Sequence, residues 1–429
     1  MAHIEPFRGI RYTLQDVSEL IAPPYDILSE KDKSTLLGKD DHNIVAIDLP
    51  YVPPKNAGPD QVYAQAAGDL TRWLDIRTLR HDPKPALYAY HQTYKLGGRT
   101  LTRKKFFARL HLEEFGKGSV FAHEQTFGGP KEDRLKLTVA TRCNLSPIFG
   151  LYPDADNEIS GLIDEAIHRA PDQFGQMDHV ANQLWVIDDA PTIKAIQVRI
   201  ADKPIFIADG HHRYGTALMY RQNMLDQMGG LADNDPVNYV LAVLGGMEDP
   251  GASIQPYFRT VSHMGHVTAN DLQSLLSEAF HWTPCPMPKS ADDLATAMSS
   301  HGMSSMAIYI SKDDACVIIS PKQADLLAES EPSHHPEWRK LAYTILHRYI
   351  FDRLLQPKLN NGKPLEIHYH KTMEEAVRDA RNDGGIACLM PATTMSQLRE
   401  ICLAGELMPQ KSTYFFPKLA TGMVINPLY

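Results

Sequence analysis

The sequence has few cysteines, and none of them form a pair at the spacing of a zinc ribbon. It holds 5 cysteines, which are scattered along the chain and odd in number. Such a set excludes a disulfide framework and is typical of a protein whose thiols stay reduced. We therefore expect a cytoplasmic location.

Long apolar runs and dense basic runs are also absent. No apolar stretch approaches the ~20 residues of a membrane-spanning helix, and residues 1–9 lack the pattern of a signal peptide. The 43 Lys and Arg are outnumbered by 52 Asp and Glu, which gives a formal net charge of -9. An acidic chain without a basic recognition helix disfavours nucleic acid and membranes as partners.

Several catalytic signatures are missing as well. The sequence contains no HExxH, GxSxG or GxGxxG motif, which excludes the usual zinc hydrolases, serine hydrolases and Rossmann dehydrogenases. His368 and His370 alternate onto one face of a predicted strand, where two metal ligands could sit. A lone pair at this spacing is usually incidental.

The length and the residue pattern predict an α/β (α+β) fold in two domains. A chain of 429 residues exceeds the size at which one core keeps growing, and we place the domains at 1–250 and 251–429. Strands over 86–94 and 100–112 flank Gly97 and Gly98, which predicts a hairpin. Its second strand carries an unusual number of basic residues: Arg103, Lys104, Lys105 and Arg109. The second domain alternates strands and helices, with strands near 305–310, 316–320, 367 and 386–390, and helices over 338–355, from 372, and over 395–402.

One stretch of the first domain predicts an anion site. Residues 205–208 form a short apolar run typical of a buried strand, and helical spacing of apolar residues runs from Tyr214 to Gly229. Between them stand Asp209, Gly210, His211, His212 and Arg213. A helix N-terminus presents unpaired N–H groups and partial positive charge, which the imidazoles and the guanidinium would reinforce. The alternative is a plain turn followed by a solvated first helical turn.

A second polar cluster follows a predicted strand end at 120–122. It contains His123, Glu124 and Thr126, then a Gly-Gly-Pro turn, then Lys131 and Arg134. A glycine hinge between a carboxylate and cations suits a loop that closes on phosphate. The run from 131 to 134 could equally be a charged first helical turn.

Near the C-terminus, Lys411 and Ser412 could hold a phosphate by charge and hydrogen bonding. The spacing lacks the glycines of a P-loop, so a Walker motif is excluded. The aromatic run 414–416 that follows could instead anchor the chain end.

These blocks together resemble a bacterial and archaeal family known as domain of unknown function 1015. The resemblance rests on five blocks in order, which span nearly the full length: Pro6–Gly9, Ala22–Asp26, His123–Thr126, Ile207–Tyr214 and Met408–Lys418.

More remotely, the Asp209–Arg213 box is similar to that of the ParB and sulfiredoxin-like fold, in which a strand, a polar turn and a helix N-terminus bind nucleotide phosphates. Small enzymes of that fold phosphorylate free serine with ADP or ATP. The resemblance implies a nucleotide-binding core of this kind, followed by a second mixed α/β domain. It also implies roles for Asp209, His212 and Arg213, with Glu124 as the base.

Three hypotheses follow. The first is a phosphotransferase that uses ATP or ADP with Mg²⁺ held by Asp209 and acts on a small hydroxyl metabolite, such as the amino acid serine. The second is a regulator that binds a nucleotide or another small molecule without chemistry, as a homodimer. The third is a hydrolase of phosphate esters, with a metal held by Asp209 and the histidines. The predicted catalytic residues are Glu124, Asp209 and His212, and the predicted phosphate- or nucleotide-binding residues are His123, Thr126, Lys131, Arg134, Gly210, His211, His212, Arg213, Lys411 and Ser412.

Overall fold

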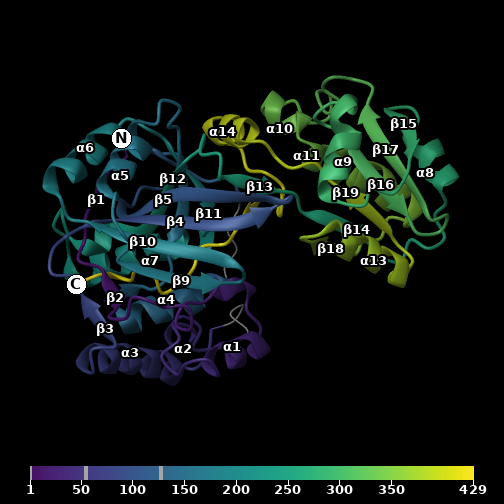
Figure 1. The fold of residues 1–429 in the computed structure, drawn as a ribbon. Coiled ribbons are helices and arrows are strands. Elements are labelled where there is room, and N and C mark those ends of the chain that lie inside the picture. The colour runs from purple at the N-terminus through teal and green to yellow at the C-terminus, as the bar shows by residue number, and fades with distance from the viewer. Residues whose placement is uncertain (1, 53–56, 125–128) are drawn as a thin grey trace. The chain divides into compact units, whose positions relative to one another are not determined.

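The structure is a computed structural model that describes residues 2–52, 57–124 and 129–429. The chain divides into two compact units (Figure 1), of which the first comprises Met1–Ala252 with Pro417–Tyr429 and the second Ser253–Phe416. The predicted boundary places residues 417–429 in the second domain, whereas in the structure they belong to the first unit. The physical reason is pairing across the chain: β21 (Asn426–Pro427) forms a ladder with β7 (Cys143–Asn144).

The first unit is built on a mixed 9-stranded sheet in the order β6-β11-β8-β12-β5-β4-β10-β9, with β1 beside β5. Strand β11 runs parallel to β6 and antiparallel to β8, and β8 runs parallel to β12. The strands are β1 (Ile4–Glu5), β4 (Leu87–Leu96), β5 (Arg99–His111), β6 (Val120–Phe121), β8 (Ile148–Tyr152), β9 (Gln173–Met177), β10 (Val180–Ile187), β11 (Ile205–Asp209) and β12 (Tyr239–Gly246), with a separate ladder of β2 (Ile10–Tyr12) and β3 (Leu79–His81).

The hairpin predicted around two glycines is confirmed. Strands β4 and β5 pair antiparallel from Tyr88 opposite Phe107 to Leu96 opposite Arg99. Gly97 and Gly98 both have positive φ, 55° and 73°. A two-residue turn of this kind matches the twist of the flanking strands and favours glycine at both positions.

The first unit also contains helices. They are α1 (Glu30–Leu37), α2 (Val45–Asp48), α3 (Asp60–Asp75), α4 (Gly129–Thr141), α5 (Glu158–Ala166), α6 (Ala190–Ile200) and α7 (His211–Met228), with short 3-10 turns η1 (Tyr25–Ile27) and η2 (Pro236–Asn238). Of these helices, α7 contacts the central strands β8 and β12.

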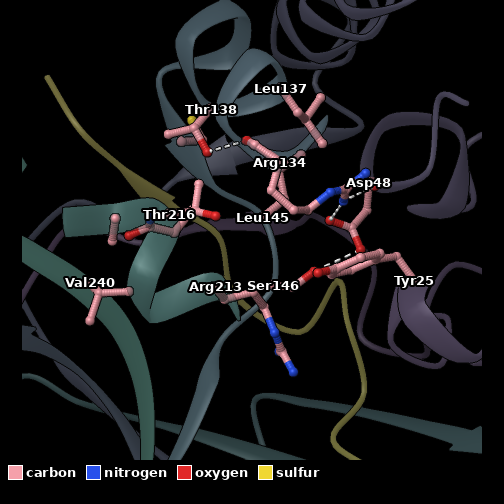
Figure 2. A pocket seen from close by; sticks show the side chains of 13 residues that line it. Tyr25, Asp48, Arg134, Leu137, Thr138, Leu145, Ser146, Arg213, Thr216 and Val240 are labelled. Carbon is pink, nitrogen blue, oxygen red and sulfur yellow. Dashed lines mark hydrogen bonds and ion pairs between the residues drawn. The ribbon is translucent and has the colours of Figure 1, made fainter. Parts of the chain in front are cut away.

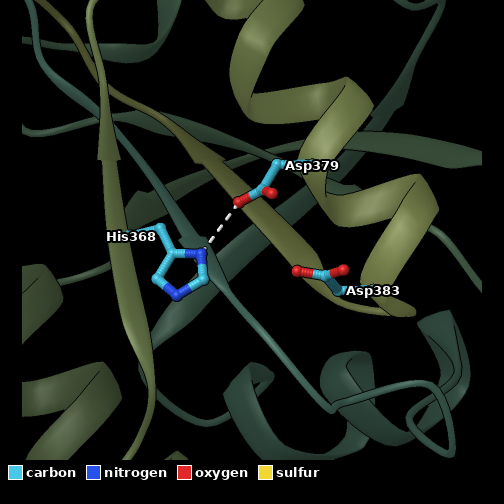
Figure 3. A group of neighbouring side chains, drawn as sticks. All are labelled: His368, Asp379 and Asp383. Atoms are coloured by element: carbon cyan, nitrogen blue, oxygen red, sulfur yellow. Dashed lines mark hydrogen bonds and ion pairs between the residues drawn. The ribbon is translucent and has the colours of Figure 1, made fainter.

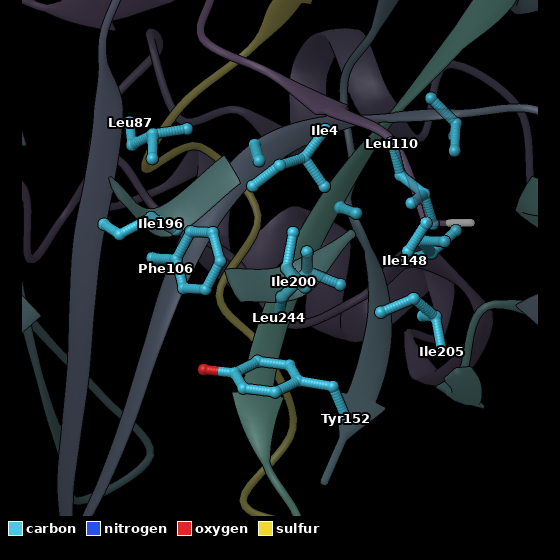
Figure 4. Close-up of a cluster of buried hydrophobic side chains, with 14 of the residues drawn as sticks. Ile4, Leu87, Phe106, Leu110, Ile148, Tyr152, Ile196, Ile200, Ile205 and Leu244 are labelled. Carbon is cyan, nitrogen blue, oxygen red and sulfur yellow. The ribbon is translucent and has the colours of Figure 1, made fainter. Parts of the chain in front are cut away.

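One buried apolar cluster of the first unit holds the strand that leads to the predicted site (Figure 4). Ile205 and Ile207 of β11 are fully buried in it, together with Ile200 of α6 and Tyr214 of α7. Full burial of an aliphatic side chain of this size stabilises the fold by about 1.5–3 kcal/mol. The start of α7 is therefore held in a fixed position at the end of β11.

The second unit contains an antiparallel 6-stranded sheet in the order β15-β17-β16-β19-β14-β18. Its strands are β14 (Phe258–Val261), β15 (Phe280–Cys285), β16 (Met306–Ile310), β17 (Ala315–Pro321), β18 (Ile367–His370) and β19 (Ile386–Leu389), with a separate ladder of β13 (Ser253–Gln255) and β20 (Tyr414–Phe416). Its helices are α8 (Ala269–Leu276), α9 (Ala291–Met298), α10 (Pro336–Lys340), α11 (Ala342–Thr344), α12 (Gln356–Leu359), α13 (Met373–Asp383) and α14 (Met395–Leu403), with a 3-10 turn η3 (Ser299–His301) and a π-helical segment η4 (Ile345–Leu355).

The α+β class predicted from the sequence is confirmed in both units, but the long helix expected over 338–355 is wrong in detail. The chain leaves the helix at Leu341, whose φ and ψ are -63° and 126°. The indole of Trp338 donates a 2.7 Å hydrogen bond to the Leu407 carbonyl, which turns α10 toward the segment that follows α14. Tertiary packing here overrides the helical periodicity.

Within the residues that the structure describes, no helix combines the length and the apolar character that a membrane span requires. The cytoplasmic location stays a prediction.

Candidate functional site

The turn between β11 and α7 depends on a glycine. Gly210 has φ 88°, and a Cβ on it would lie 3.0 Å from Arg213 Nε and 3.1 Å from Ile148 Cα. The residue is the N-cap of α7 and gives the helix no side-chain hydrogen bond. A helix N-terminus of this kind carries partial positive charge and N–H donors, as in the anion sites found at helix N-termini.

Asp209, the last residue of β11, lies between two cationic side chains. Its Oδ2 accepts a 2.7 Å hydrogen bond from Lys418 Nζ, and its Oδ1 lies 3.6 Å from Arg213 Nη2. The Gly210 N–H donates to Oδ1 at 2.8 Å. Burial alone would raise the pKa of Asp209, but Lys418 and Arg213 outweigh that effect and hold the pKa below its usual range. The carboxylate is ionised, and the two cations exceed its charge.

Two buried histidines connect the end of β6 to the start of α7. The rings of His123 and His211 meet edge to face, with centroids 4.7 Å apart and an interplanar angle of 81°. His123 Nδ1–H donates to the Ile207 carbonyl at 2.8 Å, and the His123 backbone N–H points at His211 Nε2 at 3.4 Å. Burial lowers the pKa of both imidazoles. The lowered pKa values favour the neutral form of both rings. Neutral His123 gives its single ring N–H to Ile207 and has none left for a phosphate, whereas His211, which accepts at Nε2, keeps Nδ1–H as a donor.

Other predicted residues of the two motifs lie nearby. Half-buried Glu124 follows His123 in the chain, and its charge acts on that imidazole. The aliphatic part of the Lys131 side chain packs against α7 at Gly215. A Cβ added to Gly215 would lie 3.1 Å from Lys131 Cε. His212 is half-buried in the first turn of α7, and its carbonyl accepts a 2.9 Å hydrogen bond from Thr216. Thr126 lies outside the described residues.

Arg134 is engaged within the fold. Its Nη1 donates to the Asp48 carbonyl at 2.5 Å, its Nε donates to Asp133 Oδ2 at 2.8 Å, and its guanidinium lies 4.0 Å from the Tyr25 ring centroid. Figure 2 shows Arg134 turned toward Asp48, while Arg213 extends away from that pair. Both arginines line a cavity of about 40 Å³, which has room for a few water molecules.

A buried cationic layer on the hairpin was not among the predicted site residues. Arg103 donates to Gln92 Oε1 at 2.8 Å and to the Pro417 carbonyl, and Lys105 donates to the same Gln92 oxygen. Gln92 Nε2 donates in turn to the Lys418 carbonyl at 3.0 Å, so this layer positions the lysine that reaches Asp209. Burial, with Arg103 nearby, lowers the pKa of Lys105. The basic run in the second hairpin strand was the sequence signal for this layer.

Lys411 and Ser412 belong to the second unit. Ser412 is buried, and its hydroxyl donates to the Pro409 carbonyl at 2.5 Å. Lys411 Nζ lies 5.5 Å from the Tyr257 ring centroid. Their part in phosphate binding stays a prediction. From the same C-terminal block, the structure brings Lys418 to Asp209 instead, and the position of Lys418 in that block was the available signal.

Asp209 is the metal ligand predicted from the sequence. Among the described residues, a group of three ligand atoms within 4.8 Å of one another occurs at His368, Asp379 and Asp383, and Asp209 belongs to none. Mg²⁺ in nucleotide sites is held by one or two carboxylates and by the phosphates themselves. Asp209 fits that role, whereas a tight metal site made with the neighbouring histidines does not fit.

Comparison with known proteins gives a family but no activity. A family model described as "Protein of unknown function (DUF1015)" matches residues 4–344. No curated protein matches the chain.

Several solved structures are similar to the chain at low identity. A free serine kinase mutant in complex with AMP has 10% identity and a TM-score of 0.34, over 73% of this chain and 87% of that one. A conserved hypothetical protein from Pyrococcus furiosus has 12% identity and a TM-score of 0.32, over 70% and 89%. C-terminally truncated SbnI from Staphylococcus aureus has 11% identity and a TM-score of 0.33, over 72% and 84%. Identities and TM-scores this low say nothing about the activity of this chain.

Proposed function

Because the chain belongs to the DUF1015 family of proteins of unknown function, its activity must be inferred from its own residues, and we propose a nucleotide-dependent phosphotransferase. In this proposal the site at the end of β11 binds the phosphates of ATP or ADP. A phosphoryl group then passes to the hydroxyl of a small metabolite, such as the amino acid serine.

The observation that carries the proposal is the charge balance at Asp209. One carboxylate faces two cations, Lys418 at 2.7 Å and Arg213 at 3.6 Å, beside the N-terminus of α7. This excess of positive charge and N–H donors suits a polyanion. Phosphoryl transfer consists largely of positioning and charge neutralisation, which such groups supply.

The remaining roles follow from chemistry and position. Asp209 is the residue that would hold Mg²⁺, and the ion, when bound, would supply charge neutralisation on the phosphates. Glu124 would accept the proton of the substrate hydroxyl, because it is the carboxylate that follows His123 beside the end of β11. His212 and Arg213, in the first turn of α7, would bind phosphate oxygens.

A regulator that binds a nucleotide without chemistry is the second candidate, and one observation favours it. Lys418 contacts Asp209 from the C-terminal segment, whose end pairs with β7. A phosphate that draws Lys418 away from Asp209 would change how that segment is held. Ligand binding and segment position would then be coupled.

Calorimetry and phosphorus NMR test both candidates. The full chain is titrated with ATP, ADP and AMP, with and without Mg²⁺, and phosphate transfer from ATP and ADP is then followed by ³¹P NMR with serine, threonine and homoserine. Binding with transfer to one hydroxyl compound supports the phosphotransferase. Binding without transfer to any of them supports the regulator. If no nucleotide binds, both candidates are wrong.

A further inference from the structure

A cluster of possible metal ligands lies in the second unit and is independent of the proposed nucleotide site. His368 on β18, and Asp379 and Asp383 on α13, each offer one ligand atom, and these atoms all lie within 4.8 Å of one another (Figure 3). His368 and Asp379 are partly exposed and Asp383 is exposed, so an ion can reach them from solvent.

The histidine is bonded in the manner of a metal ligand. His368 Nδ1 faces Asp379 Oδ2 at 3.1 Å, while its Nε2 faces Glu366 Oε1 at 3.2 Å. Metal-bound histidines usually donate their second ring N–H to a carboxylate, which fixes the tautomer and the ring orientation. Glu366 fills that position here. Nδ1 also faces a carboxylate, so without a metal ion it donates a proton to Asp379. A bound ion would take the place of that proton between His368 and Asp379.

Both aspartates also have a positioning partner. His370 Nε2 lies 3.1 Å from Asp379 Oδ2 and 3.1 Å from Thr260 Oγ1. Ser262 Oγ lies 3.4 Å from Asp383 Oδ2. Each of the three ligands is therefore oriented by a second side chain, as preorganised metal sites require.

The place of the aspartates on α13 independently favours a cation. Asp379 and Asp383 are four residues apart in the last turns of the helix, which ends at Gly384. Like charges at this spacing repel each other, and negative charge is unfavourable at a helix C-terminus. His368 and His370 offset part of these penalties at Asp379, and a bound cation would offset them at both aspartates.

From these contacts we infer that His368, Asp379 and Asp383 bind a divalent transition-metal ion, with Zn²⁺ as the best fit. One imidazole nitrogen and two carboxylate oxygens, with a position left for water, form a donor set that zinc accepts. Mg²⁺ and Ca²⁺ favour sets made of oxygen alone. The ion would fasten the edge strand β18 to α13, with Glu366 and His370 as positioning residues.

The test uses the full chain, purified without a histidine tag and stripped with a chelator. We expect calorimetric titration with ZnCl₂ to show one site that MgCl₂ and CaCl₂ in tenfold excess leave unoccupied. His368→Ala and Asp379→Asn should each weaken zinc binding at least tenfold. The rise in melting temperature that zinc gives the wild type should be absent in both variants. His281→Ala is the matched control, because His281 is an exposed histidine on β15 of the same sheet.

Circular dichroism of the metal-free variants separates a lost ligand from a lost fold. A second readout is the visible absorption of Co²⁺, whose intensity reports tetrahedral nitrogen and oxygen ligation and should disappear in His368→Ala. The inference is overturned if the wild type binds no zinc. It is also overturned if both folded variants bind zinc as tightly as His281→Ala does.

Discussion

The ammonium group of Lys418 donates a 2.7 Å hydrogen bond to Asp209 Oδ2, although the two residues are 209 positions apart in the sequence. The backbone of Lys418 is fixed as well, because its carbonyl accepts a 3.0 Å hydrogen bond from Gln92. The C-terminal segment is thus part of the candidate site rather than an appendage of the second unit.

Replacement of this lysine tests that relationship. Lys418→Met keeps the length of the side chain and removes its charge, so we expect ADP affinity to fall at least tenfold, about 1.4 kcal/mol. Lys84→Met is the matched control, because Lys84 is 70% exposed and pairs with Asp188. Calorimetry on the two variants and the wild type measures the effect. Equal affinity in all three would remove Lys418 from the site.

If Glu124 is the base, its replacement should lower turnover without an equal loss of nucleotide affinity. Glu124→Gln keeps the size of the side chain but cannot accept the hydroxyl proton, so turnover should fall by a factor of about 10²–10⁴. Nucleotide affinity should change less than threefold, because the phosphates bind to other residues. Phosphorus NMR and calorimetry on the same preparation give both numbers. A variant that turns over at the wild-type rate would show that Glu124 is not the base.

Replacement of Gly210 should reduce both the stability of the fold and the affinity for ADP. Gly210→Ala places a Cβ at φ 88° and 3.0 Å from Arg213 Nε, so it should cost about 1–3 kcal/mol and displace that guanidinium. Gly229→Ala is the control for strain alone, since Gly229 has φ 72° and nothing within 4 Å of an added Cβ. Urea unfolding should show a loss of stability in both variants. Calorimetry should show weaker ADP binding in Gly210→Ala alone.

The strand, the turn and the helix of this site could be predicted from the sequence because they depend on local signals. The apolar run at 205–208 is a buried strand, and the apolar spacing from Tyr214 continues as α7 to its end before Gly229. A polar stretch between such elements marks a strand end that meets a helix N-terminus. Asp209 ends the strand and Gly210 is the N-cap of the helix.

The partners of Asp209 across the chain could not be predicted in this way. Lys411 and Lys418 both belong to the block Met408–Lys418. The sequence favours Lys411 as the phosphate ligand because a hydroxyl residue follows it, yet it is Lys418 that contacts Asp209. That choice depends on long-range contacts, among them the hydrogen bonds that Arg103 and Gln92 give to the backbone at 417 and 418. Spacing along a sequence carries no information about such contacts.

We expect replacement of Lys105, the buried lysine of the cationic layer, to stabilise the fold. Lys105 is 2% exposed, and its hydrogen bond goes to Gln92 rather than to a carboxylate. Burial holds the pKa of Lys105 in the folded state well below its ordinary value of 10.5. Between the folded and the unfolded pKa, the unfolded chain therefore holds a proton on Lys105 that the folded chain lacks. The destabilisation by this lysine grows as the pH falls through that interval and is largest below it. Lys105→Met should be more stable than the wild type at pH 7 by about 1–3 kcal/mol, and by less at pH 10.

Urea unfolding at both pH values measures this difference. Lys104→Met is the neighbouring control, because Lys104 is exposed and pairs with Asp164. A Lys105→Met variant that is less stable than the wild type at pH 7 would contradict the prediction and show that the layer stabilises the fold as built.

His91 predicts part of the acid sensitivity of the first unit. The imidazole is 8% exposed, packs 5.0 Å from the Trp185 ring centroid, and has no partner at Nε2 among the described residues. Burial lowers its pKa from 6.5 to about 4. Below pH 6.5 the unfolded chain therefore binds a proton that the folded chain refuses, so stability falls as the pH drops toward 4 and this loss then levels off. At about 1.4 kcal/mol for each unit of pKa shift, the full loss is on the order of 3–4 kcal/mol. His91→Phe retains the ring against Trp185 and removes the titration. Between pH 7 and pH 4.5, urea unfolding should show a smaller loss of stability in the variant than in the wild type, and equal losses would mean that His91 takes up its proton in the folded state at its ordinary pKa.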